Sequence, residues 1–382
     1  MTITSSDPFF NELKDWSRRK LELLEKYLDA ASRILKDVYY VDGFAGRGTY
    51  GKPGEPLIPG SPLRAAQLAQ ECIDKKRAYS LRCINIELDM HNFRDLQEAT
   101  TPYSHLVTNI YGAFADNVDQ IIKIVKDDAV VCFLDPFGID GIDWTAIQRL
   151  IHQRGTIDFW IRFDVDSLRR RFGHYQANQA GSEKQFDILC RVYGISDRDY
   201  LHQLLNGATP EISKKLAIDL YLTKLRDEFK RAKREGYADA YRIESLDGEE
   251  KYYLIYACRH RKGIILASNI VYGIEEVYQK DVEQYKATQS MQSSFFGELE
   301  PSEDEVMRQK VDKLKSDIGQ ACKGKQLTRQ EIHALLLTTW FGQIKNSHVT
   351  HALKQMSDPK DGRITRSSGA ISKDDTTFIF RA

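Results

Sequence analysis

The stretch YYVDGFAGRG, residues 39–48, places a carboxylate directly before a loop of small residues. Asp42 ends an apolar run, and Gly43, Gly46 and Gly48 follow it. Glycine permits a tight turn and lets a ligand approach the backbone closely, and a following helix presents free N–H groups. The stretch therefore predicts a ligand-binding turn between a strand and a helix. A tight turn that binds no ligand is the alternative.

The spacing of the glycines distinguishes between cofactors. A dinucleotide-binding loop has the pattern GxGxxG, whereas GFAGRG has the pattern GxxGxG. An acid followed by loosely spaced glycines is typical of class I methyltransferases, which use S-adenosylmethionine. In that interpretation Asp42 attracts the positive end of the cofactor. The loop then makes room for the amino-acid part of the cofactor with Gly43, Phe44, Ala45 and Gly46.

Acids also end the next predicted strand, INIELD. Glu87 is the preferred candidate for accepting hydrogen bonds from both ribose hydroxyls, and Asp89 is the second candidate. Such an acid is expected about twenty residues after the loop, and the proline-rich insertion at residues 49–60 explains the longer gap. Asn109 and Asp116 are candidates for bonding the adenine, although Asp116 is equally placed to cap the next helix.

The segment CFLDPFG predicts the acceptor site. Methyltransferases that act on nucleobase amines end their fourth strand in D/N-P-P followed by an aromatic residue. By analogy, Asp135 would accept a hydrogen bond from the amine, the Pro136 carbonyl would accept another, and Phe137 would stack on an extruded base. Orientation of the reacting atoms would then supply much of the acceleration. This chain has only one proline, so an Asp-Pro turn followed by a core phenylalanine is the alternative.

Basic residues follow the fifth predicted strand. Arg162 lies within it, and Arg169, Arg170 and Arg171 form a run after it. These side chains are candidates for holding a phosphate backbone. A solvated helical face paired with nearby acids is an equally good interpretation.

The elements that position these residues alternate between strands and helices. A helix is predicted over residues 10–36, and the segments typical of strands are VYYVDGF, LRCINIELD, SHLVTNIYG, AVVCFLDPFG and IDFWIRFDV. Such alternation predicts a parallel sheet covered on both faces. Residues 167–235 read as a helical insertion, and AYRIES and KYYLIYACRH follow as an antiparallel pair around an Asp-Gly turn.

The predicted fold class is therefore α/β, a Rossmann-like sheet of the class I methyltransferase type with a helical insertion. We expect a methyltransferase-like domain over residues 1–285, a polar linker over 286–305 and a winged-helix-like α+β module over 306–382. Ahead of the module, Ser61 is a predicted N-cap, with Pro62 at the first position of its helix. Within the module, Thr328 is a predicted N-cap and forms a capping box with Glu331. Residues 320–382 contain ten Lys or Arg residues and five acids, so this segment is basic.

Composition limits the remaining possibilities. Lys plus Arg and Asp plus Glu both number 55, so nucleic acid would be held by a local basic patch rather than by the net charge. The six cysteines are scattered without a CxxC pair, which predicts buried thiols in a reducing cytoplasm and no metal site. Neither a signal peptide nor a membrane-spanning run is expected.

The segments WSRRKLELLEKYL, YYVDGFAGRGTY, GSPLRAA, INIELD and FLDPFG together resemble the three-Cys-motif partner proteins, called TcmP. The resemblance covers the chain from about residue 10 to about residue 275. It implies a class I methyltransferase-like fold that uses S-adenosylmethionine. It also implies a separately encoded partner protein that carries the three cysteines. The residues at the expected positions are Asp42, Gly43, Ala45, Gly46, Glu87 and Asp135.

Three functions are compatible with these patterns. The preferred one is an S-adenosylmethionine-dependent methyltransferase that acts on a nucleobase amine in DNA or RNA. The irregular DPFG favours a second, a catalytically silent methyltransferase-like module that binds nucleic acid or a partner. The third is methylation of a partner protein or peptide. A nicotinamide-dependent oxidoreductase is disfavoured by the glycine spacing.

Overall fold

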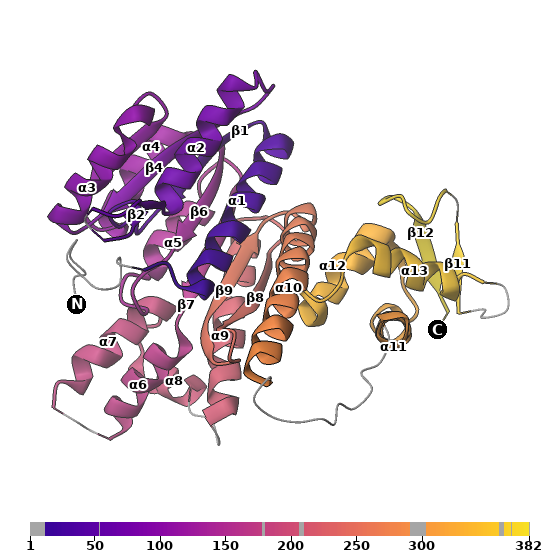
Figure 1. Ribbon diagram of the computed structural model, residues 1–382. Coiled ribbons are helices and arrows are strands. Elements are labelled where there is room, and N and C mark those ends of the chain that lie inside the picture. Colours follow the sequence, from indigo (N-terminus) through magenta and orange to yellow (C-terminus); the bar gives the residue numbers. More distant parts are fainter. Residues whose placement is uncertain are drawn as a thin grey trace. The chain divides into compact units, whose positions relative to one another are not determined.

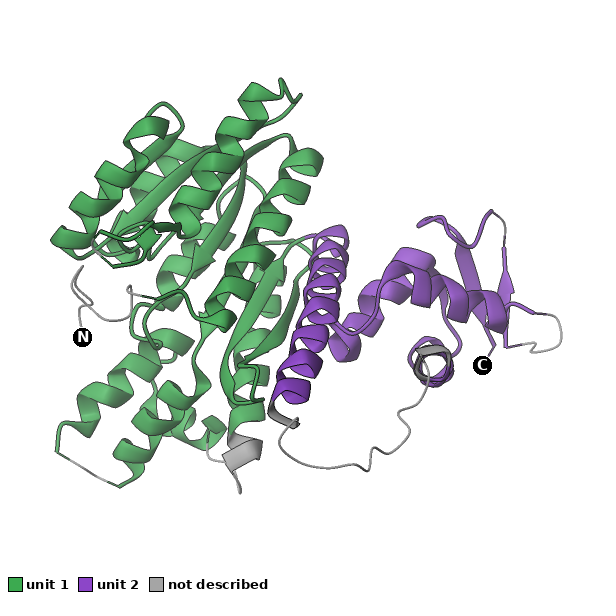
Figure 2. Cartoon of the chain, viewed as in Figure 1, with its two compact units in different colours: residues 1–259 green, residues 260–382 purple. Residues whose placement is uncertain are grey.

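The computed structural model describes residues 12–52, 54–177, 180–205, 210–290, 303–358, 363–367 and 369–381. The chain forms two compact units, residues 1–259 and residues 260–382 (Figure 2). The boundary that we expected after residue 285 falls inside helix α10 (Arg261–Ser290), which belongs to the second unit. Most of the predicted linker, residues 291–302, lies outside the described residues.

Unit 1 contains a seven-stranded sheet with the strand order β5-β4-β1-β6-β7-β9-β8 (Figure 1). Strands β1, β4, β5, β6 and β7 pair in parallel, whereas β9 is antiparallel to both of its neighbours. This confirms the predicted parallel strands and the terminal antiparallel pair. The bounds are β1 Asp37–Asp42, β4 Ser80–Glu87, β5 Val107–Tyr111, β6 Ala129–Leu134, β7 Ile157–Phe163, β8 Tyr237–Glu244 and β9 Glu250–Cys258.

Helices follow the parallel strands and pack on the sheet. Every residue of β6 is buried, as expected for a central strand covered on both faces. One hydrophobic cluster joins the sheet to the helices that bear Ile121, Ile147 and Leu225. The helices of the alternating part are α1 (Asp15–Leu35), α2 (Ser61–Asp74), α3 (Met90–Thr100), α4 (Val118–Val125) and α5 (Trp144–Ile151), with short 3₁₀ turns at Thr101–Tyr103 and Ala115–Asn117.

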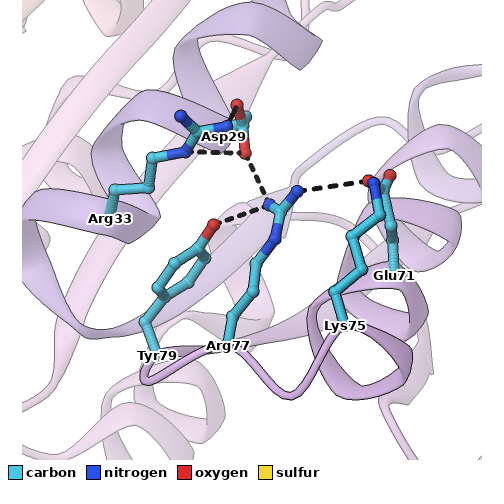
Figure 3. A network of polar contacts seen from close by, with 6 residues as sticks. All are labelled: Asp29, Arg33, Glu71, Lys75, Arg77 and Tyr79. Atoms are coloured by element: carbon cyan, nitrogen blue, oxygen red, sulfur yellow. Dashed lines mark hydrogen bonds and ion pairs between the residues drawn. The ribbon is translucent and has the colours of Figure 1, made fainter.

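Helix α1 is fixed to the rest of unit 1 by contacts in its second half. The Tyr27 ring stands edge-on to Trp160 of β7, with 5.4 Å between the ring centroids. Two residues further along α1, Asp29 accepts a hydrogen bond from Arg77 at 2.8 Å, and Arg77 also donates to Glu71 of α2 at 3.2 Å (Figure 3). Arg77 also donates to the Tyr79 hydroxyl at 2.6 Å. These contacts set the position of α1 against α2 and the segment before β4.

The expected helical insertion is present between β7 and β8. It consists of α6 (Val165–Gln176), α7 (Ser182–Tyr193), α8 (Arg198–Leu205) and α9 (Pro210–Arg231). The aromatic rings of Phe163, Tyr193 and Tyr221 pack against one another, so the insertion is anchored to the end of β7. The insertion thereby forms part of the core of unit 1.

The glycine- and proline-rich segment after the loop forms a small hairpin of β2 (Thr49–Tyr50) and β3 (Ile58–Pro59). We expected Ser61 to cap the following helix, but α2 begins at Ser61 and its N-cap residue is Gly60. The Ser61 hydroxyl instead bonds the Asp42 carboxylate. Pro62 lies in the first turn of α2, as predicted.

Unit 2 contains three helices and a three-stranded antiparallel sheet besides α10. Its elements follow the order α11 (Glu303–Cys322), β10 (Gln326–Thr328), α12 (Arg329–Trp340), α13 (Asn346–Met356), β11 (Ile364–Arg366) and β12 (Thr377–Phe380), with the sheet order β10-β12-β11. The capping box of Thr328 and Glu331 is confirmed. Arg329 is buried and donates to Asp374 at 2.7 Å and to the Asn346 carbonyl at 3.0 Å, which ties α12 to α13 and to the segment before β12.

No helix among the described residues is both long enough and apolar enough to cross a membrane. All six cysteines are free thiols, and five of them are buried. Within the described part of the chain, His, Cys, Asp and Glu side chains form no group of three or more that could hold a metal ion.

Candidate functional site

A cleft of about 330 Å³ lies in unit 1 where the loops after β1, β4 and β6 meet. Ligands of α/β sheets bind at the carboxyl ends of the strands, and this volume suits a small molecule. Nine of the residues predicted from the sequence line it: Phe44, Ala45, Gly46, Glu87, Asp89, Asp135, Pro136, Phe137 and Arg162. Seven do not line it: Asp42, Gly43, Asn109, Asp116, Arg169, Arg170 and Arg171.

Asp42 lies behind the cleft wall, and its side chain is fully buried. One carboxylate oxygen accepts a hydrogen bond from the Tyr40 hydroxyl at 2.7 Å, and the other accepts the Phe44 N–H at 3.1 Å. Burial raises the pKa of Asp42 to about 6, although the hydroxyls of Tyr40 and Ser61 oppose this shift. Asp42 therefore shapes the loop and supplies charge from behind it, rather than touching a ligand as we expected.

Glu87 connects the glycine loop to the end of β4. Its Oε2 accepts the Gly46 N–H at 2.8 Å, and its Oε1 accepts the Asp89 N–H at 2.7 Å. The Gly46 φ of 59° lies in the left-handed region, which glycine adopts at little cost. Burial raises the pKa of Glu87, whereas the two N–H donors lower it. The carboxylate is thus held rigidly at the edge of the cleft, and each oxygen keeps a further lone pair for a ligand.

Gly43 is required by packing. A Cβ at this position would lie 2.6 Å from Cδ2 of Leu134 and 3.0 Å from Cδ2 of Phe114. The Gly43 N–H donates to the Phe133 carbonyl at 2.9 Å, which continues the sheet for one more bond. The absence of a side chain at Gly43 lets the loop lie directly on β6.

Two candidates for the adenine end of a cofactor have other roles. Asn109 donates to Thr100 at 2.8 Å and accepts from Asn85 at 2.9 Å, so it joins β5 to α3 and β4. Asp116 is exposed within a 3₁₀ turn, and the N-cap residue of α4 is Asn117, so our alternative for Asp116 as a helix cap is wrong. Asp89 lines the cleft and also caps α3, since it accepts the N–H groups of His91 and Asn92.

Two basic side chains contact the segment Asp135–Phe137. Asp135 forms a hydrogen-bonded ion pair with Lys20 of α1, and its second oxygen lies 3.8 Å from Nη1 of Arg162. The same Nη1 donates to the Pro136 carbonyl at 3.2 Å. Phe137 is 54% exposed, so it lies at the cleft surface rather than in the core. The two atoms expected to receive an amine are therefore already paired with cations.

The arginine run lies apart from Arg162. Arg169 pairs with Asp166, Arg171 pairs with Asp140, and Arg170 is exposed on α6. These contacts fit the interpretation of a solvated helical face paired with acids. Only Arg162 of this predicted set lines the cleft.

Sequence reasoning missed Lys20, Tyr50 and Ser61. Tyr50 lies in the β2–β3 hairpin and Ser61 begins α2, and both line the cleft, although their residue types do not indicate this. Lys20 did carry a signal, because it shares the buried face of α1 with Leu24 and Tyr27 at helical spacing. A lysine on an apolar helix face needs a buried partner, and that partner is Asp135.

No family model matches the chain, and no curated protein matches it. Among solved structures, the chain is similar to an O-methyltransferase from Bacillus cereus in complex with SAH, with 15% identity over 62% of this chain and 80% of that one and a TM-score of 0.29. It is also similar to the O-methyltransferase TomG from Streptomyces achromogenes in complex with SAM, with 11% identity, 67% and 97% coverage and a TM-score of 0.30. A third is TYW2 from M. jannaschii in complex with AdoMet, with 10% identity, 64% and 76% coverage and a TM-score of 0.30. At these values the function must be argued from the residues of the cleft.

Proposed function

We propose that the chain is a methyltransferase that binds S-adenosylmethionine in the cleft of unit 1. The observation that carries the proposal is the charge of the cleft beside its glycine loop. Glu87 and Asp89 line it beside the loop, whereas Asp135 and Asp140, which line it further along, pair with Lys20 and Arg171. The acids beside the loop favour a cationic ligand there and disfavour the pyrophosphate of a dinucleotide. A sulfonium metabolite that also carries an adenosine fits this lining.

The two ends of the cleft suit the two ends of that cofactor. The rigid Glu87 carboxylate has lone pairs left for the ribose hydroxyls. The amino-acid part would lie along Phe44, Ala45 and Gly46, with the buried charge of Asp42 behind them. When bound, S-adenosylmethionine supplies an electrophilic methyl group. The residues of this chain bind it, orient it and exclude water.

The expected acceptor, a nucleobase amine, would need two hydrogen-bond acceptors at the other end of the cleft. Asp135 and the Pro136 carbonyl supply them in the sequence pattern, and Phe137 supplies a surface for stacking. In the structure Lys20 bonds one Asp135 oxygen and Arg162 bonds the Pro136 carbonyl. A nucleic acid remains the proposed substrate, and the acceptor atom is argued separately below.

Unit 2 supports a nucleic-acid substrate as a winged-helix-like module. Its order of helix, strand, two helices and two strands is the order of a winged helix. In this assignment α13 is the helix that would enter a groove of the nucleic acid. Lys354 lies on α13, and Arg363 and Arg366 flank and end β11. After α11, the exposed basic residues among the described ones are Lys323, Lys325, Lys354, Arg363, Arg366, Lys373 and Arg381. The three-Cys-motif partner implied by the resemblance to TcmP is proposed as a second partner.

Isothermal titration of the full chain with S-adenosylmethionine tests the cofactor. We expect binding that Glu87→Ala abolishes or strongly weakens, while Glu98→Ala on the exposed face of α3 leaves it unchanged. No heat from the unmodified chain would end the proposal. Binding without transfer of a labelled methyl group to any nucleic acid, or to the partner protein, would support the silent binding module instead.

Fluorescence anisotropy with labelled RNA and DNA tests the role of unit 2. We expect the double change Arg366→Ala and Lys373→Ala in the full chain to weaken binding and to lower its salt dependence. Lys280→Ala, on the exposed face of α10, is the matched control. Equal affinity in all three proteins would remove unit 2 from the nucleic-acid site.

A further inference from the structure

Three charged side chains from distant segments of unit 1 meet at the acceptor end of the cleft. Lys20 comes from α1, Asp135 follows β6 and Arg162 lies near the end of β7. Lys20 is 2% exposed and bonds Asp135, while the Arg162 guanidinium lies 4.6 Å from the ring centre of Tyr252. The cluster is therefore built into the fold, with protein groups behind each of its cations.

Burying the Lys20 ammonium costs solvation free energy, because the charged group loses its contacts with water. Burial lowers the pKa of Lys20, the Asp135 carboxylate opposes this, and Arg162 lowers it further. A buried ion pair of this kind contributes little net stability compared with apolar side chains. Its position against a residue that lines the cleft points to a role in the site.

Two atoms of the cluster lack a hydrogen bond although they are buried. They are Oδ1 of Asp135, which can only accept, and Nε of Arg162, which can only donate. Buried polar atoms normally have a partner, so both need an explanation. Oδ1 of Asp135 lies 3.8 Å from Nη1, another nitrogen of the same guanidinium, so the two side chains are close but have no direct hydrogen bond.

The hydrogen-bond inventory distinguishes a hydroxyl from an amine. An exocyclic amine offers two donors and needs two acceptors. Among the buried atoms of the cluster, the two without a hydrogen bond are an acceptor, Oδ1 of Asp135, and a donor, Nε of Arg162. A hydroxyl donates one hydrogen bond and accepts others, so it matches this pair.

We infer that the acceptor is a ribose 2′-hydroxyl of RNA, held between Asp135 and Arg162. The inference rests on the proposed function, because it assumes the same cleft and cofactor and the nucleic-acid substrate. The 2′-hydroxyl is the group that distinguishes RNA from DNA, and the exposed ring of Phe137 offers a stacking surface for a neighbouring base. Oδ1 of Asp135 and Nε of Arg162 are both covered, so the two side chains must shift when the acceptor enters.

The transfer balances without a further reactant. The hydroxyl oxygen forms a bond to the methyl carbon while the bond from carbon to sulfur breaks, and that electron pair neutralises the sulfonium. The hydroxyl proton passes to Asp135 and from there to water. Lys20 acts as a positioning residue, because it holds the Asp135 carboxylate and does not line the cleft.

The first test uses the full chain with methyl-labelled S-adenosylmethionine and two random-sequence single-stranded pools, one of RNA and one of DNA. The products are digested to nucleosides and analysed by mass spectrometry. We expect a methyl group on ribose in the RNA pool and none in the DNA pool. A methyl group on a base in either pool overturns the inference.

Calorimetric titration of the same protein separates the two proposals. If S-adenosylmethionine binds but the RNA pool gains no methyl group, the inference fails and the cofactor proposal stands. If S-adenosylmethionine does not bind, both fail.

The second test asks whether Lys20 acts through Asp135. We expect Lys20→Met to lower kcat about 10-fold or more while the KM for S-adenosylmethionine stays unchanged, because one charged hydrogen bond to Asp135 is lost. Lys20→Arg should restore much of kcat, and Lys26→Met on the exposed face of α1 should have no effect. Thermal unfolding checks that each variant is folded.

If Lys20→Met does not fold, Asp135→Asn is used instead, and its kcat is expected to fall about 100-fold. Unchanged kcat in the folded variant overturns the role of the cluster.

Discussion

Gly46 donates its backbone N–H to Oε2 of Glu87 across 2.8 Å, so a charged hydrogen bond joins the loop after β1 to the end of β4, next to the bond from the Ala45 N–H to the Ile86 carbonyl. The bond spans 41 residues of sequence and fixes the edge of the cleft at which the ribose of a cofactor would lie. A carboxylate accepts at both oxygens, whereas the amide of glutamine accepts at only one. The side chain at this position must therefore be an acid to hold both Gly46 and Asp89.

Glu87→Gln should lower the affinity for S-adenosylmethionine about 10-fold or more. The amide NH₂ would face one of the two backbone N–H donors, and charged hydrogen bonds are worth about 1.5–3 kcal/mol. Isothermal titration measures the change, with Glu98→Gln on the exposed face of α3 as the matched control. Equal affinity of Glu87→Gln and the unmodified chain would place the ribose elsewhere.

The buried charge of Asp42 should make cofactor binding depend on pH. Its pKa is raised to about 6, so the carboxyl is mostly ionised at pH 8 and mostly protonated at pH 5. A positive ligand is attracted only by the ionised form. We expect the affinity for S-adenosylmethionine to fall as the pH is lowered through about 6.

Asp42→Asn separates this effect from other titrations. Its affinity should be lower at pH 8 and should change less between pH 8 and pH 5, although Glu87 still contributes because its pKa is also raised. Titration calorimetry at several pH values measures both proteins. Parallel pH profiles would show that Asp42 only supports the loop through its bonds to Tyr40 and Phe44.

The sequence predicted the strands of unit 1 well, because apolar runs between turn signals report local preferences. Its strand-end acids were harder to assign. Asp42, Glu87 and Asp135 all follow or end buried strands, yet Asp42 faces inward to Tyr40 whereas Glu87 and Asp135 line the cleft. The direction of each side chain depends on how its loop crosses the sheet, and periodicity contains no information about that path.

Partners distant in sequence were the other source of error. The ion pair between Lys20 and Asp135 spans 115 residues, and the Arg162 contact with Pro136 joins β7 to the segment after β6. The sequence identified Asp135, Pro136 and Arg162, but it could not show that two cations bond the groups expected to receive an amine. The capping box of Thr328 and Glu331 was predicted correctly because both of its hydrogen bonds lie within four residues.

Gly43→Ala should destabilise unit 1 by about 1–3 kcal/mol, since the added methyl group would meet Leu134 at 2.6 Å and overpacking forces neighbours to move. Gly173→Ala is the matched control, because nothing lies within 4 Å of its Cβ position in α6. That change should be neutral or should stabilise by about 0.5–1 kcal/mol through helix propensity. Chemical denaturation measures both variants. A stable Gly43→Ala protein would show that the loop can move away from β6.

The final prediction concerns the carboxyl group that anchors α1 to the sheet. Asp158 of β7 accepts the Tyr27 hydroxyl at 2.6 Å, and the Tyr27 hydroxyl also lies 2.6 Å from that of Tyr256. Burial raises the pKa of Asp158 to about 6, although the two tyrosine hydroxyls oppose the shift. The folded state therefore binds a proton more readily than the unfolded state does between about pH 4 and pH 6.

This difference in proton binding decides how the free energy of unfolding changes with pH. The free energy of unfolding should fall as the pH rises through that window, and a shift of about 2 units corresponds to about 3 kcal/mol from this one group. Asp158→Asn cannot ionise, so its free energy of unfolding should fall less between pH 4 and pH 7 by up to that amount. Urea denaturation at several pH values measures the difference, with Asp281→Asn on the exposed face of α10 as the control. If Asp158→Asn and the unmodified chain lose stability in parallel, Asp158 is not the carboxyl that stays protonated against Tyr27.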